Sequence, residues 1–308
     1  MLRSYLTIAL RTLWRSKGYT AINVVGLSVA FCVSLFLLLN AYVELTYDSF
    51  HADGDRIFQT YFFANDPEGA TRGTSMPLPL MPALKAEYPE LEAAARLMTI
   101  RKSLVEYQGK YFDKEVRLTD PDFLKIFSFP LLKGNRATAL NGLSNIVISA
   151  QLARALFGEE DPIGKQLVAG LDGSRRSYII TGVLVDPPYN SSIQYEALVR
   201  IENLPGYHDQ LDEWSSYSHR VYVKLAPGAT RETFEKQLKA FTRKYYPGTF
   251  DELESKGAKP DERGDLFAVR LQQLSDVRFD KEVSGQKGIP PSIYTLVGIA
   301  IFVLLIAC

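Results

Sequence analysis

The chain has 308 residues, enough for about two domains, and its 35 basic and 35 acidic residues cancel in formal charge. This balance excludes a nucleic-acid binder that works by bulk charge, and a hydrophobic content of 46% excludes a disordered chain. Two cysteines and three histidines exclude a disulfide-stapled scaffold and a cysteine-rich zinc module, and they leave little material for a histidine-based metal site.

The first apolar segment begins after Lys17, because no charged residue occurs between Lys17 and Glu44. These 26 residues would extend about 39 Å as a helix, which exceeds the ~30 Å of bilayer hydrocarbon. We therefore predict a transmembrane helix over residues 19–43. A cleaved signal peptide is the alternative, but its apolar run is about 7–15 residues long and ends at a small-x-small site. The run here is longer and ends in residues 40–43, which lack such a site.

The charges around this segment predict its orientation. Four basic residues and no acidic residue precede it, namely Arg3, Arg11, Arg15 and Lys17. Only acidic charges follow it until Arg56. The positive-inside rule therefore places residue 1 in the cytoplasm and residue 44 outside.

Residues 1–18 have a helical pattern of their own. One face of the predicted helix is apolar and another is mainly basic, with Leu2, Tyr5, Leu6, Ala9 and Leu13 on the first and Arg3, Thr7, Arg11 and Arg15 on the second. This pattern predicts a cytoplasmic amphipathic helix that lies on the inner leaflet against membrane lipids. A disordered, positively charged flank is the alternative.

A second apolar segment follows Lys287, the last charged residue, and contains 21 uncharged residues. We interpret residues 289–308 as the start of a second transmembrane helix that enters from outside after Pro290 and Pro291. It stops at Cys308 without a polar or positive flank, so we expect the sequence to be the N-terminal part of a longer membrane protein.

The region between the two segments, residues 44–288, mixes two periodicities. Strand-like runs occur at 56–64, 145–149, 178–186, 220–225 and 266–271. Apolar residues at helical spacing predict helices at 230–246, 150–157 and near 79–88. Thr230 and Ser149 are suited to cap two of these helices, and Pro247 and Gly158 are suited to stop them. Interleaved strands and helices predict an α+β or a mixed α/β domain, and we take α+β as the expected class of the periplasmic domain.

Two loop-like stretches, residues 130–145 and 203–218, interrupt this region. We expect the segment between them to be a subdomain inserted into the first. A short aromatic helix around Phe123, Phe127 and Phe129 is expected to pack on a sheet.

No motif in this region predicts catalysis. Residues 158–166 (GEEDPIGKQ) resemble a phosphate loop, but five residues separate the glycines where four are needed, and glutamine follows the lysine. Residues 51–56 (HADGDR) lack the spacing of a calcium loop. Both segments, and the sequon at residues 190–192, are expected to be turns. The sequence predicts no catalytic residue, no cofactor and no metal site.

Several segments together resemble MacB-like/FtsX-like ABC transporter permeases. The opening SYLTIALRTLWRSKGYTAINVVGLSVAFCVSLFLL is similar to the start of these proteins, and YDSFHADGDRIFQTYF to the start of their periplasmic core domain. DPDFLKIFSFPLLKGN, NIVISAQLARALFGEEDPIGKQL and YIITGVLVDPPYNSSIQYEALV follow in the family's order. SIYTLVGIAIFVLLIAC resembles the beginning of the second membrane helix. The resemblance covers essentially the whole chain.

This resemblance implies a mechanical part of a transporter in the bacterial inner membrane, with residues 44–288 in the periplasm. ATP would be hydrolysed by a separate ABC ATPase subunit, and the periplasmic domain would change shape in response. That domain would have a porter-like part at about 50–130 and 217–284 and a sabre-like part at about 131–216. The resemblance further implies a homodimer or paired permease, and a periplasmic adaptor or lipoprotein as partner. It implies export, lipoprotein trafficking or envelope regulation as the process served.

Two other classes of function remain open at this point. A two-span sensor with an extracytoplasmic ligand-binding domain has the same topology, although such domains commonly begin with a long helix that continues from the membrane. A membrane-anchored enzyme has the same topology too, but it needs an acid, base, nucleophile or metal set that the sequence does not offer.

Overall fold

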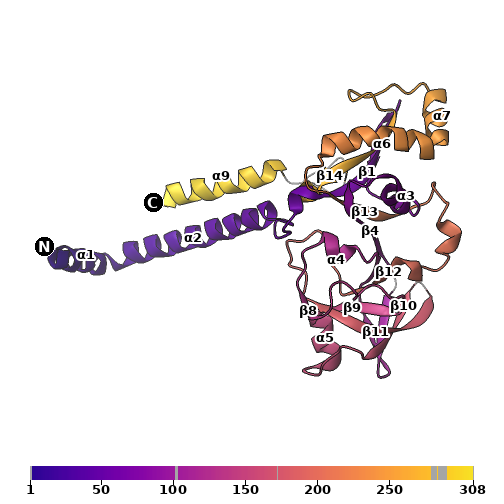
Figure 1. The fold of residues 1–308 in the computed structure, drawn as a ribbon. Helices are drawn as coiled ribbons and strands as arrows, with labels where there is room; N and C mark the ends of the chain where they lie inside the picture. Colours follow the sequence, from indigo (N-terminus) through magenta and orange to yellow (C-terminus); the bar gives the residue numbers. More distant parts are fainter. Residues whose placement is uncertain (1, 101–102, 172, 279–282, 284–289, 308) are drawn as a thin grey trace. The chain divides into compact units, whose positions relative to one another are not determined.

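The computed structural model describes residues 2–100, 103–171, 173–278, 283 and 290–307 (Figure 1). The chain forms two compact units. One consists of Met1–Tyr47 with Gly288–Cys308 and is called here the helical unit. The other consists of Asp48–Lys287 and is called the sheet domain.

The helical unit contains α1 (Leu2–Arg15), α2 (Lys17–Leu45) and α9 (Pro290–Ala307). The two helices expected at the start of the chain are therefore both present. The break between them falls at Ser16, so Lys17 belongs to α2, while the expected boundary after residue 18 between cytoplasm and membrane stays a prediction.

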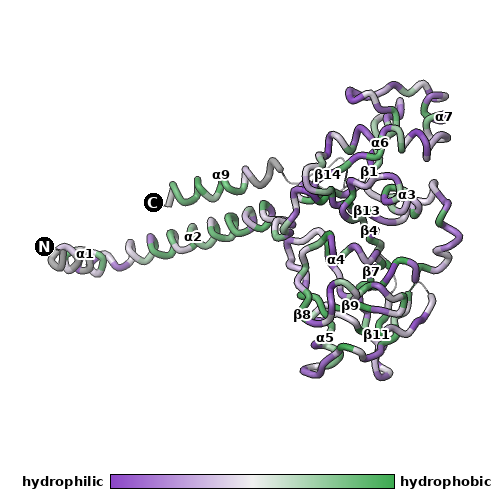
Figure 2. The backbone as a smooth tube through the Cα atoms, viewed as in Figure 1, coloured by the Kyte–Doolittle hydropathy of each residue, from purple (hydrophilic) through white to green (hydrophobic). Residues whose placement is uncertain are grey.

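Helix α2 has 29 residues and is long and apolar enough to cross a membrane, and α9 contains a shorter apolar helix at Tyr294–Leu305. Figure 2 shows hydrophobic residues along most of α2 and the described part of α9. Large apolar side chains such as Val25, Phe31 and Phe36 are exposed on α2. A helix whose outward face is apolar is suited to lipid rather than to water.

Helices α2 and α9 pack against each other through small residues. The less exposed positions of α2 include Ala30, Ser34 and Ala41, which recur at near-heptad spacing, and Ser34 and Ala41 are buried. The Ser34 hydroxyl donates a hydrogen bond to the carbonyl oxygen of Ala300, at 3.1 Å. Small residues allow two membrane helices to approach closely, and a serine can then bond across the contact.

The sheet domain interleaves strands with short helices, as the sequence predicts. Its elements in chain order are η1 (Gly54–Arg56), β1 (Ile57–Asp66), β2 (Gly69–Gly73), β3 (Met76–Pro77), α3 (Leu80–Glu87), β4 (Leu91–Thr99), β5 (Ser103–Tyr107), β6 (Lys110–Asp113), β7 (Val116–Thr119), α4 (Phe123–Ile126), β8 (Leu131–Gly134), β9 (Asn145–Ser149), α5 (Ala150–Phe157), β10 (Gln166–Leu171), β11 (Ser174–Leu184), β12 (Ala197–Arg200), η2 (Ile201–Asn203), η3 (His208–Gln210), β13 (Tyr217–Leu225), α6 (Arg231–Tyr245), α7 (Pro247–Ser255), β14 (Phe267–Gln273) and η4 (Leu274–Asp276).

The strands form one mixed sheet with the order β14-β1-β13-β4-β7-β12-β9-β11-β10-β5-β6. Pairing is antiparallel except between β12 and β7 and between β11 and β9. We call β14-β1-β13-β4 the first half of the sheet and the strands from β7 to β6 the second half. The two halves meet where β4 pairs with β7.

Three hydrophobic cores hold this sheet. The first lies between the first half and helices α3 and α6, and includes Phe63, Phe234 and Phe241. The second lies on the second half with α5, around Tyr178. The third contains residues of both halves, from β4 and β13 to β9 and β12, together with the aromatic side chains of residues 123–129. The third core therefore joins the two halves as one folding unit.

Local sequence signals match the structure at several helix ends. The Thr230 hydroxyl accepts the N–H of Thr233 at the start of α6, and the Ser149 hydroxyl accepts the N–H of Leu152 at the start of α5. Helix α5 ends at Gly158, whose φ of 60° favours glycine. The predicted aromatic helix is present as the single turn α4, which contains Phe123, and Phe123, Phe127 and Phe129 are all buried.

Two local expectations are corrected. Pro247 follows the end of α6 and is also the first residue of α7. The backbone N–H at the first position of a helix has no acceptor within the helix, so proline, which lacks this N–H, is tolerated there. The stretch 130–145 is not all loop, since β8 lies within it and pairs with β11. Strand β8 is short and mostly exposed, so its sequence lacks a clear alternation.

The expected insertion of residues 131–216 stays a prediction, but the strand order moves its first boundary. Strands β5, β6 and β7 lie before residue 131 and yet belong to the second half of the sheet. The chain leaves the first half after β4, so a boundary near residue 100 fits the strand order better. The return to the first half occurs at β13, close to the expected position.

Candidate functional site

The chain enters the sheet domain through residues 48–53, which we call the anchor loop and of which Asp48 and His51 are buried. Asp48 has a φ of 56°, a conformation that asparagine and aspartate tolerate better than most residues. Its N–H donates to the carbonyl oxygen of Asn190 at 2.9 Å. Its Oδ1 accepts the Ser191 hydroxyl at 3.1 Å and the Ser192 N–H at 2.9 Å. These bonds fix the backbone where the chain first enters the domain.

Burial dominates the electrostatics of this carboxylate. Asp48 is 3% exposed. Burial raises the pKa of the Asp48 carboxyl, although the hydrogen bonds from Ser192 and Ser191 act in the opposite direction. The group is thus held in place by polar contacts that do not fully compensate the loss of water.

His51 is the second fixed point of the anchor loop. Its Nδ1 accepts the N–H of Ser128 at 3.1 Å, and the N–H of Ala52 donates to the Ser128 hydroxyl at 3.0 Å. The rings of Phe127 and Phe129 lie 5.4 and 5.1 Å from the imidazole, centroid to centroid. Burial lowers the pKa of His51 to about 4. A neutral imidazole whose Nδ1 accepts a bond carries its proton on Nε2.

A cluster of ion pairs connects the end of the anchor loop to the first half of the sheet. Lys224 of β13 lies 2.6 Å from Asp53 and 2.9 Å from Glu92 of β4, measured from Nζ to the nearest carboxylate oxygen. Arg56 pairs with the same two carboxylates and donates to the carbonyl oxygen of Leu225 at 2.7 Å. Burial would lower the pKa of Lys224, but Asp53 and Glu92 outweigh it and raise the pKa.

The chain leaves the described sheet through residues 273–277, which we call the exit turn. Leu274 is buried in the third core, with Val277 beside it in the same cluster. A cavity of about 260 Å³ lies between the exit turn and the anchor loop, and His51, Gly54 and Ser275 are among its lining residues. The beginning of the sheet domain and the segment that follows its last strand, β14, are therefore held side by side on one aromatic core.

A buried ion pair joins the two halves of the sheet. Arg96 of β4 makes two side-chain bonds to Asp120, which follows β7, at 2.7 and 2.9 Å. The backbone N–H of Arg96 also donates to Asp120, at 2.7 Å, and its guanidinium contacts the Tyr207 hydroxyl at 3.2 Å. Burial opposes the charge of Arg96, yet Asp120 outweighs it and raises the pKa of Arg96.

Comparisons with known proteins identify the domain. The sequence matches the MacB-like periplasmic core domain over residues 20–241, which is well over half of the chain. The chain belongs to this family. A search of curated proteins finds no match.

Solved structures resemble this MacB-like domain. A crystallised domain of a protein described as a permease from Porphyromonas gingivalis shares 26% sequence identity, with a TM-score of 0.60 over 72% of this chain and 91% of that one. The periplasmic region of MacB from Actinobacillus actinomycetemcomitans has 14% identity and a TM-score of 0.46, over 73% and 91% of the two chains. The extracellular domain of the noncanonic ABC-type transporter YknZ from Gram-positive bacteria has 16% sequence identity and a TM-score of 0.42, over 69% of this chain and 98% of that one.

The topology-determining residues of the MacB-like chain lie outside the sheet domain. Arg11 and Arg15 are exposed on α1, and Lys17 is exposed at the start of α2, with its Nζ 4.8 Å from the centroid of the Trp14 ring. The side chain of Arg3 lies outside the described residues. Their role in orientation stays a prediction.

The two rejected motifs are turns in the MacB-like domain. HADGDR forms the second part of the anchor loop and η1, and GEEDPIGKQ contains the turn before β10, where Gly164 has a φ of 81°. Within the described part of the chain, no group of three His, Cys, Asp or Glu residues could hold a metal ion.

Sequence reasoning missed the contacts that make the anchor loop a site. It assigned HADGDR and Asn190-Ser191-Ser192 to two unrelated turns. The structure joins Asp48, which lies three residues before HADGDR, to Ser191 of the second turn across 143 positions of sequence. Residues 48–53 mix polar and aromatic side chains, but this pattern does not by itself show which distant segment the loop contacts.

Proposed function

We propose that this chain is part of the transmembrane subunit of a MacB-like ABC transporter and transmits motion mechanically. ATP hydrolysis by a separate ABC ATPase subunit moves the membrane helices, and the periplasmic domain changes shape in response. The chain works as a homodimer or paired permease, with a periplasmic adaptor or lipoprotein as further partner. It serves export, lipoprotein trafficking or envelope regulation.

One observation carries this proposal beyond the family assignment. The anchor loop and the exit turn face each other across one cavity and are both fixed to the third core. The anchor loop follows α2 directly in sequence, with the helix ending at Leu45 and the first buried contact at Asp48. A displacement of the chain at residue 48 therefore acts on buried, close-packed groups, which transmit strain rather than absorb it.

The same proposal includes the location of the chain. Helix α2 crosses the bacterial inner membrane, with residues 1–18 in the cytoplasm and residues 44–288 in the periplasm. Arg3, Arg11, Arg15 and Lys17 hold the start of the chain on the cytoplasmic side. An alkaline phosphatase fusion after Asp66 should be active, because that enzyme matures outside the cytoplasm. Replacing the four basic residues by glutamate should lower this activity severalfold.

The coupling is tested with the complete permease and its ATPase in nanodiscs. Hydrogen exchange of residues 48–56 and 186–195 is measured in the apo state and after trapping with ATP and vanadate. We expect trapping to change exchange in both segments. The variant Asp48→Ala should keep basal ATP hydrolysis but lose the change in residues 186–195, since the bonds to Ser191 and Ser192 are gone. The matched control is Asp251→Ala, at an exposed position of α7.

Two results would contradict the proposal. The first is that no ATPase copurifies with the complete permease. The second is that nucleotide trapping leaves both segments unchanged in the wild-type protein. A cytoplasmic kinase or cyclase domain encoded after residue 308 would instead identify the sheet domain as a sensor.

A further inference from the structure

The two edge strands of the sheet differ in whether their outward backbone groups form hydrogen bonds. At one end, α6 covers β14 and supplies acceptors to its outward N–H groups: Glu235 accepts from Leu271 at 2.9 Å and Thr242 accepts from Val269 at 3.4 Å. At the other end, β6 is the last strand in the sheet order. Within the described residues, no hydrogen bond is present on the outer side of β6.

The hairpin geometry shows which groups of β6 face outward. Strands β5 and β6 are joined by Gln108 and Gly109, both with positive φ, which is a two-residue hairpin turn. In such a hairpin Tyr107 and Lys110 form a hydrogen-bonded pair, and the pattern alternates from there. The N–H and C=O groups of Tyr111 and Asp113 therefore point away from β5 and towards the next strand position.

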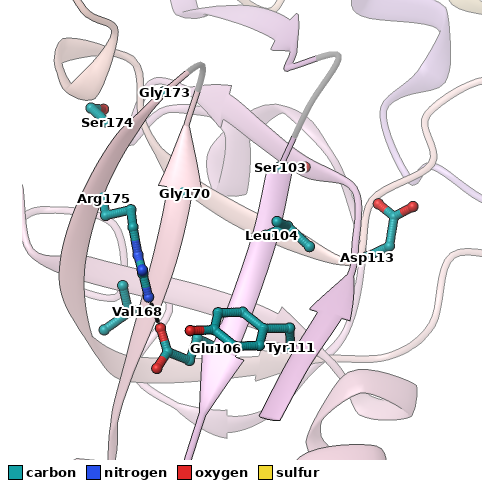
Figure 3. Close-up of a pocket in the computed structure, with 10 residues that line it drawn as sticks. All are labelled: Ser103, Leu104, Glu106, Tyr111, Asp113, Val168, Gly170, Gly173, Ser174 and Arg175. Atoms are coloured by element: carbon teal, nitrogen blue, oxygen red, sulfur yellow. Dashed lines mark hydrogen bonds and ion pairs between the residues drawn. The ribbon is translucent and has the colours of Figure 1, made fainter. Parts of the chain in front are cut away.

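The side chains of the same two residues lie on an open cleft (Figure 3). This cleft has a volume of about 540 Å³ and lies on one face of β6, β5, β10 and β11. Val168 and the half-exposed Leu104 provide apolar surface, and Gly170 leaves part of the floor without a side chain. The opposite face of these strands is covered by the second core, which includes Val105 and Ala169.

The charges of the cleft are not balanced. Arg175 is paired with Glu106, as the dashed line in Figure 3 shows. Asp113 has no ion-pair partner among the described residues, and it is exposed. Tyr111 is 59% exposed beside it. The surface thus offers an unpaired carboxylate and an exposed aromatic ring two positions apart, on the face where an added strand would place alternate side chains.

We propose that the outer edge of β6 binds an extended segment of a periplasmic partner protein, which adds one strand to the sheet. The backbone groups of Tyr111 and Asp113 pair with that segment, as in known cases of strand addition. Side chains of the segment at alternate positions lie on the cleft face, with lysine or arginine opposite Asp113 and a β-branched or aromatic residue opposite Tyr111. The partner's chemistry is thus alternating basic and apolar. This inference rests on the proposed periplasmic location and specifies the partner expected there.

The test measures peptide binding to the purified chain of residues 1–308 in nanodiscs, without any ATPase. The probes are the acetylated, amidated peptides KTVTKTVT and ETVTETVT, which place lysine or glutamate on the same face as valine. We expect the lysine peptide to bind about fivefold more tightly than the glutamate peptide, the size of effect that one cross-strand charge pair produces. Binding should weaken with added salt, because the pair is exposed.

Two variants separate this site from non-specific attraction. Asp113→Lys should reverse the preference, so that the glutamate peptide binds more tightly. Tyr111→Pro removes the outward N–H without removing a bond to β5, so it should abolish binding while the unfolding midpoint stays within the range of the wild type. The matched controls are Asp251→Lys and Tyr189→Ala, at exposed positions away from the cleft, and both should bind as the wild type does.

A structural readout completes the test. Hydrogen exchange of residues 110–113 should slow severalfold on addition of the lysine peptide in the wild type and not in Tyr111→Pro. Equal binding of both peptides, or binding retained by Tyr111→Pro, overturns the proposal. A dimer that Tyr111→Pro dissociates, with no peptide bound, overturns it in favour of a second copy on this edge. Because no ATPase is present, failure here leaves the coupling test of the proposed function unaffected.

Discussion

The two halves of the sheet differ in how their faces and outer edges are covered. The first half is covered by the first core on one face and shares the third core on the other, and its outer edge is closed by side chains of α6. The end of the second half is covered on one face by the second core, while its other face and its edge strand β6 are open. A region whose faces and outer edge are covered is close-packed, and a close-packed region transmits strain. A region with an open face and edge can receive another chain.

The largest effect should come from breaking the buried pair between the halves. Arg96→Met leaves Asp120 buried without its partner, and we expect a loss of about 3–5 kcal/mol in the free energy of unfolding. The measurement is denaturant unfolding followed by Trp214 fluorescence in a Trp14→Phe background. The control is Arg175→Met, which removes an exposed pair in the cleft and should cost under about 1 kcal/mol. Similar losses in the two variants would contradict the contrast between closed and open regions.

Acid should destabilise the sheet domain through His51 of the anchor loop. Its pKa is lowered to about 4 by burial, so the unfolded chain takes up a proton at higher pH than the folded chain. The stability is therefore complete above about pH 6.5 and falls as the pH decreases to about 4, by about 3 kcal/mol at most. Burial raises the pKa of Asp48, and this contribution has the opposite sign, being lost as pH rises.

The measurement for this prediction is the unfolding midpoint between pH 7 and pH 4. His51→Phe should flatten the profile, because phenylalanine keeps the aromatic contacts and takes up no proton. His219, whose pKa burial lowers to about 3, remains in the variant and accounts for a residual slope. An unchanged slope in His51→Phe would show that the anchor loop does not contribute to acid sensitivity.

The closed edge should lose stability when its side-chain acceptor is removed. Glu235→Met leaves the N–H of Leu271 buried without a partner, and we expect a cost of about 1–3 kcal/mol. Glu235→Gln keeps an acceptor oxygen and loses only the ion pairs to Arg231 and Arg263, so it should cost less than Glu235→Met. Hydrogen exchange at Leu271 should rise in the methionine variant alone.

The smallest effect should come from the open edge. Tyr111→Pro removes an N–H that faces outward, and we expect a change within about 1 kcal/mol. Phe112→Pro removes an N–H that bonds to β5, and it should cost clearly more. Equal costs at the two positions, measured by unfolding, would show that the hairpin register of β5 and β6 is not the one described.

Local patterns in the sequence predicted the helices and strands that depend on residues close to one another in the chain. The α6 and α5 caps need only a hydroxyl and an N–H three residues apart, and both are present where Thr230 and Ser149 predict them. The strands β1, β9, β13 and β14 were also predicted near their observed positions, because β-rich or alternating runs carry their own signal. The short strands β5 to β8 were missed, since segments of four or five residues give too few positions to establish a period.

The long-range contacts of the anchor loop and of Arg96 could not be predicted in the same way. The bond between Asp48 and Ser191 and the pair of Arg96 with Tyr207 join residues more than 100 positions apart. Neither residue type nor spacing distinguishes a loop aspartate in water from one that will be buried against a distant turn. The boundary of the expected insertion stays a prediction, and the loop pattern could not show the strand order, because sheet order is decided by which strands pair and not by where loops occur.

The sequence by itself determined the long apolar helix, its charged flank, the mixed α+β character and the family, because each depends on composition, spacing or the order of segments along the chain. Only the tertiary structure decided that the anchor loop and exit turn share one core, that Arg96 and Asp120 join two halves of one sheet, and that one edge is closed while the other is open. Such features depend on burial, and burial exists only after distant segments have packed together.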